Sequence, residues 1–420
     1  MKVIGGTRRL GLYGASVVLN GVISLITIPI VIAVAGADPW ASMATGQSIG
    51  NSIGVLVAFG WGLTGPATIA MAAVDKRPGL FLDSLFSRAA LLLPLILVQA
   101  LVTIAIVPHA KFVAFVAGLA MTLAGVSANW YFSGESRPGR FLLLDTVPRV
   151  LGTVAGLLLV VLTGELLFFA LAQLAGSLLA LGVSSYVIFR GQNLDFRRAA
   201  RWRNVVGRLA EQRHGVVATG LNAALTPAIL GVVAVLAPPT LPLFVLADRL
   251  SKFVGMGASP LIQVFQGWVP AARGRELLRR ISVSARVTLA LALVATIAYA
   301  ALLPWFSQLL THGQVAVDVS SSIAFALVAS SWIIAPYLTN VALMAVGQVR
   351  VIAVSAMVGV PLTLALLAGA EAAGLWQSAP WAIVVGNAVG MVWLGLALRR
   401  AVRGPLEPAP VTGQPLQAVS

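Results

Sequence analysis

Long apolar stretches are the sequence feature that most limits the folds available to this chain. Runs of about 20 residues with few charges recur along the 420 residues, and this is the length that an α-helix needs to cross the hydrocarbon core of a bilayer. The chain is 59% hydrophobic and 10% charged, and it shows no alternation at the period of two that barrel strands require. The sequence therefore predicts an all-α integral membrane protein. The twelve expected spans are 11–35, 45–74, 89–108, 112–132, 141–163, 166–189, 216–238, 241–269, 283–304, 323–346, 351–370 and 380–398.

The positive charges are distributed unevenly between the two sides of the predicted membrane. The net charge is +15, but all except three of the 28 Lys and Arg residues lie in alternate connections or at their flanks. The exceptions are Lys111, on the opposite side, and Arg249 and Lys252, inside a predicted span. We expect the protein in the cytoplasmic (inner) membrane. Because positive residues accumulate on the cytoplasmic side of membrane proteins, both termini are predicted to lie in the cytoplasm. The charge reflects topology, and no nucleic-acid partner is expected.

Residues that usually carry catalysis or metal binding are scarce. There is no cysteine, and the three histidines are far apart near predicted helix ends. The connections on the outer side hold at most about a dozen residues, which leaves no room for an external catalytic domain. We therefore expect no enzyme, no metal and no cofactor, and the function must lie within the spans or the inner connections.

The longest inner connection divides the chain into two halves of six spans. The fourth span ends with Asn129–Arg140 and the tenth with Asn340–Arg350, and both segments carry an Asn and a basic residue. Two pseudo-symmetric lobes around a central cavity are a common transporter plan. The predicted organisation is an N-terminal lobe at 1–189, a basic cytoplasmic linker at 190–215, a C-terminal lobe at 216–403 and a disordered cytoplasmic tail at 404–420.

Two local patterns suggest special structure. Arginines in the linker alternate with the apolar residues Phe196, Trp202, Val205, Val206 and Leu209, which favours a basic helix on anionic membrane lipids over a plain linker. In the second span the run Gly60–Pro66, GWGLTGP, weakens the helix. That run predicts either a joint or close helix packing around small residues.

Three charges stand inside the eighth predicted span. A charge at the centre of a membrane helix raises the free energy of insertion by at least about 2.5 kcal/mol. The presence of Asp248, Arg249 and Lys252 in this span therefore requires a structural or functional explanation. Asp248 and Lys252 are four residues apart and can pair, whereas Arg249 points about 100° away. They either pair structurally with a carboxylate such as Asp145 or form a cationic surface that faces a water-filled cavity. The second interpretation is favoured because the site is about 14 Å deep.

Further polar residues in the spans complete a candidate substrate site. A cavity of amides, Trp and cations suits a substrate with hydroxyls and an anionic group, since Arg binds phosphate oxygens bidentately and Trp faces stack on sugar rings. Each amide could equally be a helix-packing residue. Besides the three charges, the candidate substrate-binding residues are Asp145, Arg149, Trp61, Gln47, Asn51, Gln263 and Gln266.

Three segments of the sequence resemble a known transporter family. Ala58–Ala70 (AFGWGLTGPATIA), Asn129–Gly152 (NWYFSGESRPGRFLLLDTVPRVLG) and Phe244–Pro270 (FVLADRLSKFVGMGASPLIQVFQGWVP) are similar to the Wzx-type polysaccharide flippases of the MOP superfamily, which also holds the MATE extruders and the MurJ-like flippases. The resemblance implies a transporter that moves undecaprenyl-pyrophosphate-linked oligosaccharide to the outer leaflet by alternating access.

The same resemblance implies roles for individual residues. Arg249 and Lys252, and less closely Arg149, match the cationic positions that receive the pyrophosphate, and Asp145 and Asp248 are the acidic candidates for coupling to a H⁺ or Na⁺ gradient. MurJ-like relatives carry two further helices that this chain lacks, which disfavours lipid II as the substrate. Glycan polymerases or glycosyltransferases are the implied partners.

Two other functions remain open. A MATE-like ion-coupled exporter of small molecules would present carboxylates to cationic drugs, whereas the charge balance within these spans is positive. A non-transporting scaffold of a glycan-assembly complex would work through the basic linker and would not need Arg249 or Lys252.

Overall fold

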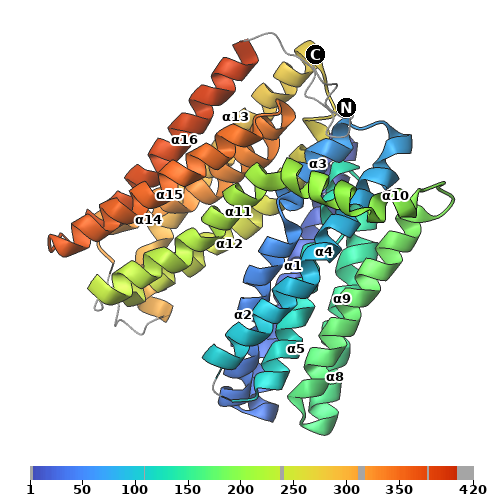
Figure 1. Cartoon of the computed structure of the whole chain (residues 1–420). Coiled ribbons are helices and arrows are strands. Elements are labelled where there is room, and N and C mark those ends of the chain that lie inside the picture. Colours follow the sequence, from blue (N-terminus) through green and yellow to red (C-terminus); the bar gives the residue numbers. More distant parts are fainter. Residues whose placement is uncertain (1–2, 108, 237–240, 311–316, 376–377, 404–420) are drawn as a thin grey trace. The chain divides into compact units, whose positions relative to one another are not determined.

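The computed structural model describes residues 3–107, 109–236, 241–310, 317–375 and 378–403 (Figure 1). Over these ranges the chain is helical and contains no strand, which confirms the predicted all-α membrane fold. It forms two compact units, Met1–Val216 and Val217–Ser420, called unit 1 and unit 2 below.

In unit 1, α1, α4 and α9 each form a single span, whereas the second and fourth spans are interrupted. The second is broken between α2 and α3, and the fourth is split into α5, η2 and α6. The elements are α1 (Val3–Ala35), α2 (Ala37–Ala58), α3 (Trp61–Met71), η1 (Val74–Lys76), α4 (Arg77–Ile106), α5 (Lys111–Thr122), η2 (Leu123–Val126), α6 (Asn129–Gly134), α7 (Pro138–Arg140), η3 (Phe141–Thr146), α8 (Val147–Thr163), α9 (Leu166–Phe189), α10 (Phe196–Ala200) and α11 (Trp202–Leu236), which continues into unit 2.

Unit 2 has longer, less interrupted helices. One of its spans contains a π-helical segment, η5, and unit 1 carries a similar segment, η3, in its fifth span. The elements are α12 (Leu241–Trp268), α13 (Gly274–Leu310), α14 (Val319–Tyr337), η5 (Leu338–Leu343), α15 (Val349–Ala372) and α16 (Ala379–Arg403).

The spans agree with the expected apolar stretches. Within the described residues, eight helical segments are long and apolar enough to cross a membrane, and the bent pair Ser42–Ala58 and Trp61–Met71 makes a ninth. The other three expected stretches fall in α1, α11 and α12, which have 33, 35 and 28 residues. Of the twelve expected stretches, only residues 108, 237 and 238 lie outside the described residues. The chain is thus a multi-pass membrane protein.

The joint predicted in the second span is present. Phe59 and Gly60 have positive φ angles of 43° and 82°, and the helix bends by 43° there. Gly60 tolerates this backbone conformation because it has no Cβ. Beyond the joint, Trp61 to Ala70 are buried except Gly62, so the run Gly60–Pro66 provides both the break and the close packing.

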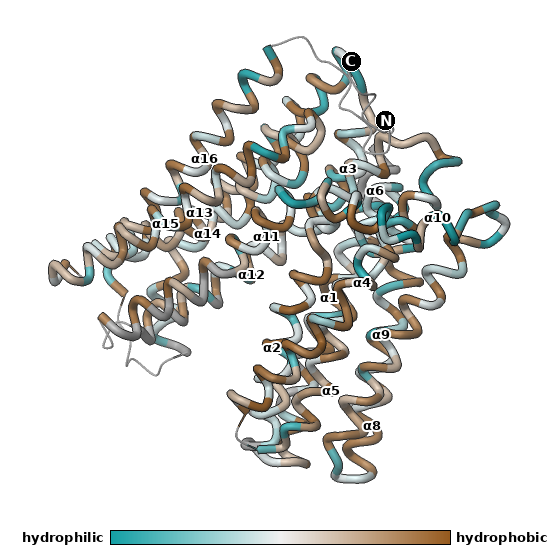
Figure 2. Tube along the Cα trace, in the orientation of Figure 1, coloured by the Kyte–Doolittle hydropathy of each residue, from teal (hydrophilic) through white to brown (hydrophobic). Residues whose placement is uncertain are grey.

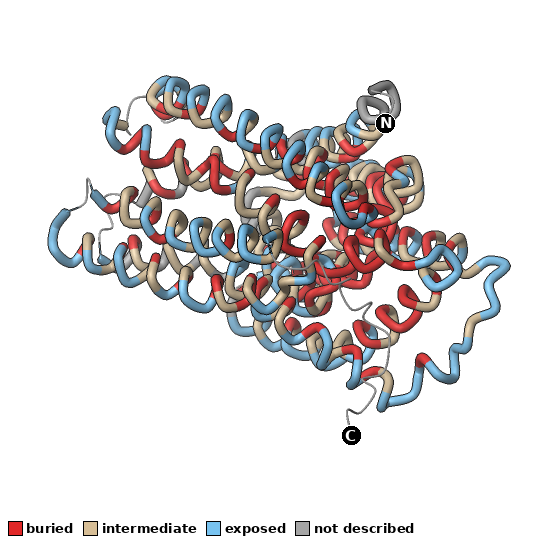
Figure 3. The backbone as a smooth tube through the Cα atoms, turned by 90° about the horizontal axis from the view of Figure 1, so that it is seen from above, coloured by how far each residue is buried: buried red, intermediate tan, exposed pale blue. Residues whose placement is uncertain are grey.

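Glycines set the packing of α2 against α5. Gly46, Gly50 and Gly54 recur every four residues, and a methyl group on Gly50 would overlap the backbone of Gly118. Thr122 Oγ1 also donates to the Gly50 carbonyl at 3.2 Å. Such small-residue stripes let membrane helices approach closely, because packing rather than hydrophobicity drives their association in lipid. Buried residues accordingly gather on the sides of helices that face other helices (Figure 3).

The core of unit 2 joins α12 to α13 and α14. Phe244 packs edge-on against Phe325 with ring centroids 5.3 Å apart. Tyr299 on α13 donates from its hydroxyl to the Ala247 carbonyl at 2.9 Å, and Ser251 donates to the same hydroxyl at 3.3 Å. These contacts fix the rotation of α12 about its axis and therefore decide which of its side chains are exposed.

The basic segment Arg190–Gly215 packs on unit 1. Asp83 of α4 is 2% exposed and accepts from Arg208 Nη2 at 2.7 Å, from Asn204 Nδ2 at 3.2 Å and from Arg198 Nη2 at 3.5 Å. Further along the segment, Thr64 Oγ1 of α3 donates to Gln212 Oε1 at 2.7 Å. The segment is therefore docked on α3 and α4, although it is among the most hydrophilic parts of the chain (Figure 2).

One residue of the expected lipid-facing set is turned inward. Val205 is only 4% exposed because it lies on the docked side of α11, whereas Trp202 and Val206 are 70% and 44% exposed. Val205 therefore belongs to the docked side of α11, and the predicted contact of the basic helix with anionic lipids stays a prediction. The tail 404–420, expected to be disordered, lies outside the described residues.

Candidate functional site

The charged span of unit 2 is α12, and its predicted ion pair is present. Lys252 Nζ lies 2.6 Å from Asp248 Oδ2. The Lys252 side chain is 44% exposed in unit 2, whereas that of Asp248 is 18% exposed. Asp248 begins the third turn of α12 and Lys252 stands one turn later, which confirms the pairing expected from their spacing. The cation is thus the more accessible member of the pair.

The exposed face of α12 continues beyond this pair. Met256 is 54% exposed and lies one turn after Lys252, and Gln263 is two further turns along the same side of the helix. Gln263 Oε1 is buried and has no hydrogen-bond partner among the described residues. Gln266 is 8% exposed and lies in the interior instead. The side chain of Arg249 lies outside the described residues, so its predicted role remains a prediction.

In unit 1 two candidate substrate-binding residues form an ion pair at a π-helical segment. Asp145 is in η3 and Arg149 in the first turn of α8, and Arg149 Nη2 lies 3.5 Å from Asp145 Oδ1. A π-helical segment adds a residue to the helical turn and often marks functional sites. Asp145 is 7% exposed, and Arg149 Nε is buried without a hydrogen-bond partner in the described structure. The two residues are four apart and in contact, but one guanidinium donor is unused.

A chain of hydrogen bonds links this pair to α9 and α2. Thr153 Oγ1 donates to the Arg149 carbonyl at 3.1 Å, and Gln173 Nε2 donates to Thr153 Oγ1 at 3.5 Å. Gln47 Nε2 of α2 donates to Gln173 Oε1 at 2.8 Å. The neutral groups of three helices therefore form one polar track in unit 1, which we call the α2–α8–α9 track.

The remaining polar residues of α2 separate into exposed and buried positions. Asn51 is exposed, as are Ser48 and Ser52, whose hydroxyls donate to carbonyls four residues earlier. Exposed amides and hydroxyls on a membrane helix disfavour lipid as their neighbour, because lipid offers no hydrogen-bond partner. Trp61 is different: it is 2% exposed and its ring packs on Trp130 with centroids 5.3 Å apart. In this structure Trp61 is a core residue whose faces are covered, so the expected stacking on a sugar ring has no free surface.

Sequence reasoning missed Arg88, which it assigned to an inner connection. Arg88 lies inside α4, is 1% exposed and has no acidic partner among the described residues. Its Nη1 donates to the carbonyls of Gly125 at 3.0 Å and Ser127 at 2.9 Å, where the fourth span is broken. Its guanidinium also lies 5.6 Å from the centroid of Trp130. Pro78, at the start of α4, could have shown that the helix begins early enough to include Arg88.

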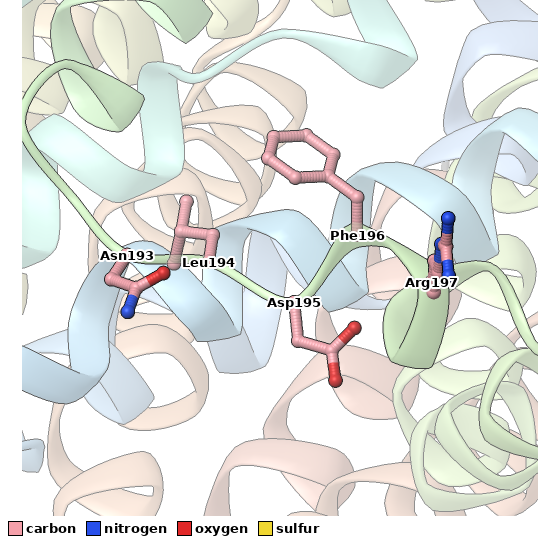
Figure 4. Close-up of a pocket in the computed structure, with 5 residues that line it drawn as sticks. All are labelled: Asn193, Leu194, Asp195, Phe196 and Arg197. Carbon is pink, nitrogen blue, oxygen red and sulfur yellow. The ribbon is translucent and has the colours of Figure 1, made fainter.

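In the described parts of the chain no group of three His, Asp or Glu residues could hold a metal ion. An open hollow is lined by Asn193, Leu194, Asp195, Phe196 and Arg197 (Figure 4), at the start of α10 and in the connection before it.

Comparisons with known proteins identify the fold. No model of a known protein family matches the chain. No curated protein sequence matches it. Solved structures do match. One is a MOP superfamily transporter from Pyrococcus furiosus Vc1, which superposes with a TM-score of 0.72 at 13% identity. That transporter is described as having a binding pocket of reverse polarity that suggests a different function. That match covers 94% of this chain and 96% of the other.

Two further structures give the same result. A multidrug resistance MATE family transporter of the MOP superfamily, in an outward-facing conformation, matches with a TM-score of 0.67 at 12% identity over 94% of this chain and 97% of the other. A MATE in its straight conformation matches with a TM-score of 0.66 at 13% identity over 95% and 97%. The chain therefore has the fold of the MOP superfamily transporters.

Proposed function

We propose that this protein is a transporter that flips an oligosaccharide linked to undecaprenyl pyrophosphate across the cytoplasmic membrane, by alternating access, for the synthesis of a surface polysaccharide. Both termini would lie in the cytoplasm. The transporter fold supports the general class, and the charges and polar groups of the spans support the substrate.

The exposed ammonium of Lys252 carries the proposal. A cation in a membrane helix costs at least about 2.5 kcal/mol when lipid surrounds it, so a half-exposed Lys252 requires water or an anion nearby. Asp248 offsets part of its charge, and Arg249, the next residue, adds a second cation to the same helix. A diphosphate supplies negative charge and several acceptor oxygens at once, which is what this part of α12 needs.

The polar groups of unit 1 fit the carbohydrate part of such a substrate. Gln47 and Asn51 offer amide donors and acceptors, and the α2–α8–α9 track supplies hydroxyl and amide groups without net charge. Sugar hydroxyls both donate and accept hydrogen bonds, so neutral groups of this kind recognise them. Arg149 stands at the end of the track with an unused guanidinium nitrogen, and it is a second candidate to bind a phosphate oxygen.

A MATE-like exporter of small molecules is the second candidate, because the fold matches structures of multidrug transporters. An exporter of cationic drugs needs accessible carboxylates. Yet Asp145 is 7% and Glu371 3% exposed, and the side chain of Asp248 is 18% exposed and bound to Lys252. The accessible charge is positive, which favours an anionic substrate. Asp145 and Asp248 remain candidates for coupling to H⁺ or Na⁺.

The test is the leaflet distribution of the cell's own lipid-linked oligosaccharide. Cells that lack the protein are complemented with wild type, with Lys252→Gln, or with Lys111→Gln as the control. Lys111 is an exposed lysine at the start of α5, so its substitution makes the same change in charge outside the site. We expect wild type and the control to relieve the accumulation in the inner leaflet, and Lys252→Gln to reduce flipping at least tenfold.

Three results would contradict the proposal in different ways. An unchanged leaflet distribution without the protein would remove the flippase function. Loss of drug efflux in the same cells would favour the exporter. Full activity of a Lys252→Gln, Arg249→Gln double variant would reject the cationic substrate site. The scaffold function would then remain, which works through the basic segment and its partners in glycan synthesis.

A further inference from the structure

The basic segment Arg190–Gly215 has two faces with different environments. Its docked face consists of Ala199, Val205, Arg208 and Gln212, each less than 10% exposed. These residues contact α3 and α4, and Asp83 neutralises Arg208. Contacts within unit 1 therefore account for the burial of the docked face.

The opposite face carries large apolar side chains in the open. Trp202 is 70% exposed, and Val206, one turn later on α11, is 44% exposed. On α10, Phe196 is 49% exposed and points to the opposite side of the backbone from Asp195, whose carboxylate caps α10 (Figure 4). We call this the free face. Exposed Trp side chains favour the boundary between water and lipid, where the apolar ring and its polar N–H are both satisfied. Phe is common beside Trp on the apolar face of interfacial helices.

Unpaired cations surround these side chains. Arg197, Arg201 and Arg203 are all exposed, and none of them has an ion pair among the described residues. Arg198 and Arg208, in contrast, are bound to Asp83. The basic charge of the segment is therefore divided: part of it docks the segment, and three arginines remain available on the outside.

The free face lies at the end of a membrane span. The span α9 ends at Phe189, and the ring of Phe189 packs edge-on against Phe196 with centroids 5.7 Å apart. Phe196 therefore stands at the level where α9 leaves the hydrocarbon core and where lipid headgroups begin. A combination of Trp, Phe and Arg at this level is typical of helices that bind anionic lipids in the interface.

We propose that the free face is a binding surface for anionic phospholipid headgroups, with Arg197, Arg201 and Arg203 contacting phosphates and Phe196 and Trp202 inserted among the headgroups. Such lipids hold the basic segment at the membrane surface from outside, as Asp83 holds it from inside. This inference concerns a lipid of the surrounding leaflet, and it stands whether or not the protein transports a glycan.

The experiment uses the purified full-length protein in a neutral detergent. It is titrated with phosphatidylglycerol or with phosphatidylcholine, and the apparent unfolding temperature is followed. We compare wild type with the triple variant Arg197→Gln, Arg201→Gln, Arg203→Gln. The control is Arg273→Gln, Arg275→Gln, Arg279→Gln, which removes the same charge from three exposed arginines before and within α13.

We expect phosphatidylglycerol, and not phosphatidylcholine, to stabilise wild type and the control. Each arginine near an anionic surface contributes roughly a factor of five to binding, so the triple variant should need at least tenfold more phosphatidylglycerol for half of the effect. Trp202→Ala should weaken the response in the same direction. If phosphatidylglycerol has no effect on wild type, if the triple variant responds as wild type does, or if the control loses the response equally, the free face is not this lipid site.

Discussion

Asp83 should contribute more to the stability of unit 1 than any exposed carboxylate, because it is the buried partner of the docked segment. Substituting Asp83 by Ala leaves Arg208, whose side chain is 11% exposed, with only Glu211 at 3.0 Å. Burial by itself lowers the pKa of Arg208, whereas Asp83 and Glu211 raise it. A guanidinium is not deprotonated in proteins, so Arg208 keeps its charge after the substitution. Breaking a buried ion pair by removing one partner costs about 3–5 kcal/mol.

The expected loss lies at the lower end of that range, because Glu211 still binds Arg208. A loss of about 3 kcal/mol corresponds to a fall in apparent unfolding temperature of roughly 6–12 °C for a unit of this size. The measurement is thermal unfolding of the purified protein in detergent at a fixed heating rate. Asp75→Ala is the control, since Asp75 is exposed and lies at the same end of α4. It should change the stability by less than about 0.5 kcal/mol.

A double-mutant cycle tests the mechanism itself. Arg208→Met removes the guanidinium and keeps the apolar stem, so the Asp83→Ala, Arg208→Met variant no longer buries an unpaired charge. The two single losses should then exceed the loss of the double variant by about 1–3 kcal/mol. Additive effects, or an Asp83→Ala variant that unfolds with wild type, would refute the ion-pair argument.

Three further substitutions test the packing of the spans and one helix terminus. Gly50→Ala should destabilise unit 1 by about 1–3 kcal/mol, because the added methyl group would overlap the backbone of α5. Gly62→Ala is the control and should be neutral, because its methyl group would enter open space. Equal effects of the two substitutions on thermal unfolding would contradict this prediction. Arg88→Ala should cost about 3 kcal/mol by the same assay, because two carbonyls at the break in the fourth span lose their donor, and an unchanged unfolding temperature would disprove that role. Asp318 caps α14 through a bond from Ser321 N at 3.1 Å, and hydrogen bonding to Ser321 lowers the pKa of Asp318. Asp318→Ala should therefore cost about 1 kcal/mol above pH 4, and the difference from wild type should shrink as the pH falls through the lowered pKa of Asp318. A difference that does not change on acidification would contradict the assignment.

The fold could be predicted because its main signal is local. Runs of about 20 apolar residues specify spans without reference to the rest of the chain, and the run Gly60–Pro66 identified the joint in the second span. The pairs Asp248–Lys252 and Asp145–Arg149 were visible for the same reason, since residues four apart share one face of a helix.

The rest of the candidate site depends on contacts between distant residues. Gln47 and Gln173 are 126 positions apart, so no spacing rule could join them into one track. Trp61 was expected to face a substrate, but whether an aromatic residue is exposed or buried depends on which helix packs on it. Arg88 was assigned to a connection because arginine usually flanks a span, and only the break in another helix explains why it is buried.

The docking of the basic segment also has a consequence for how the protein is made. Asp83 and Arg208 are 125 residues apart, and ribosomes add about 5–20 residues per second. For roughly 6–25 seconds after Asp83 has been synthesised, its carboxylate has no guanidinium to bind. The spans of unit 1 are therefore assembled while Asp83 is still unpaired, and unit 1 reaches its final stability only after its six spans and the first part of α11 have been synthesised.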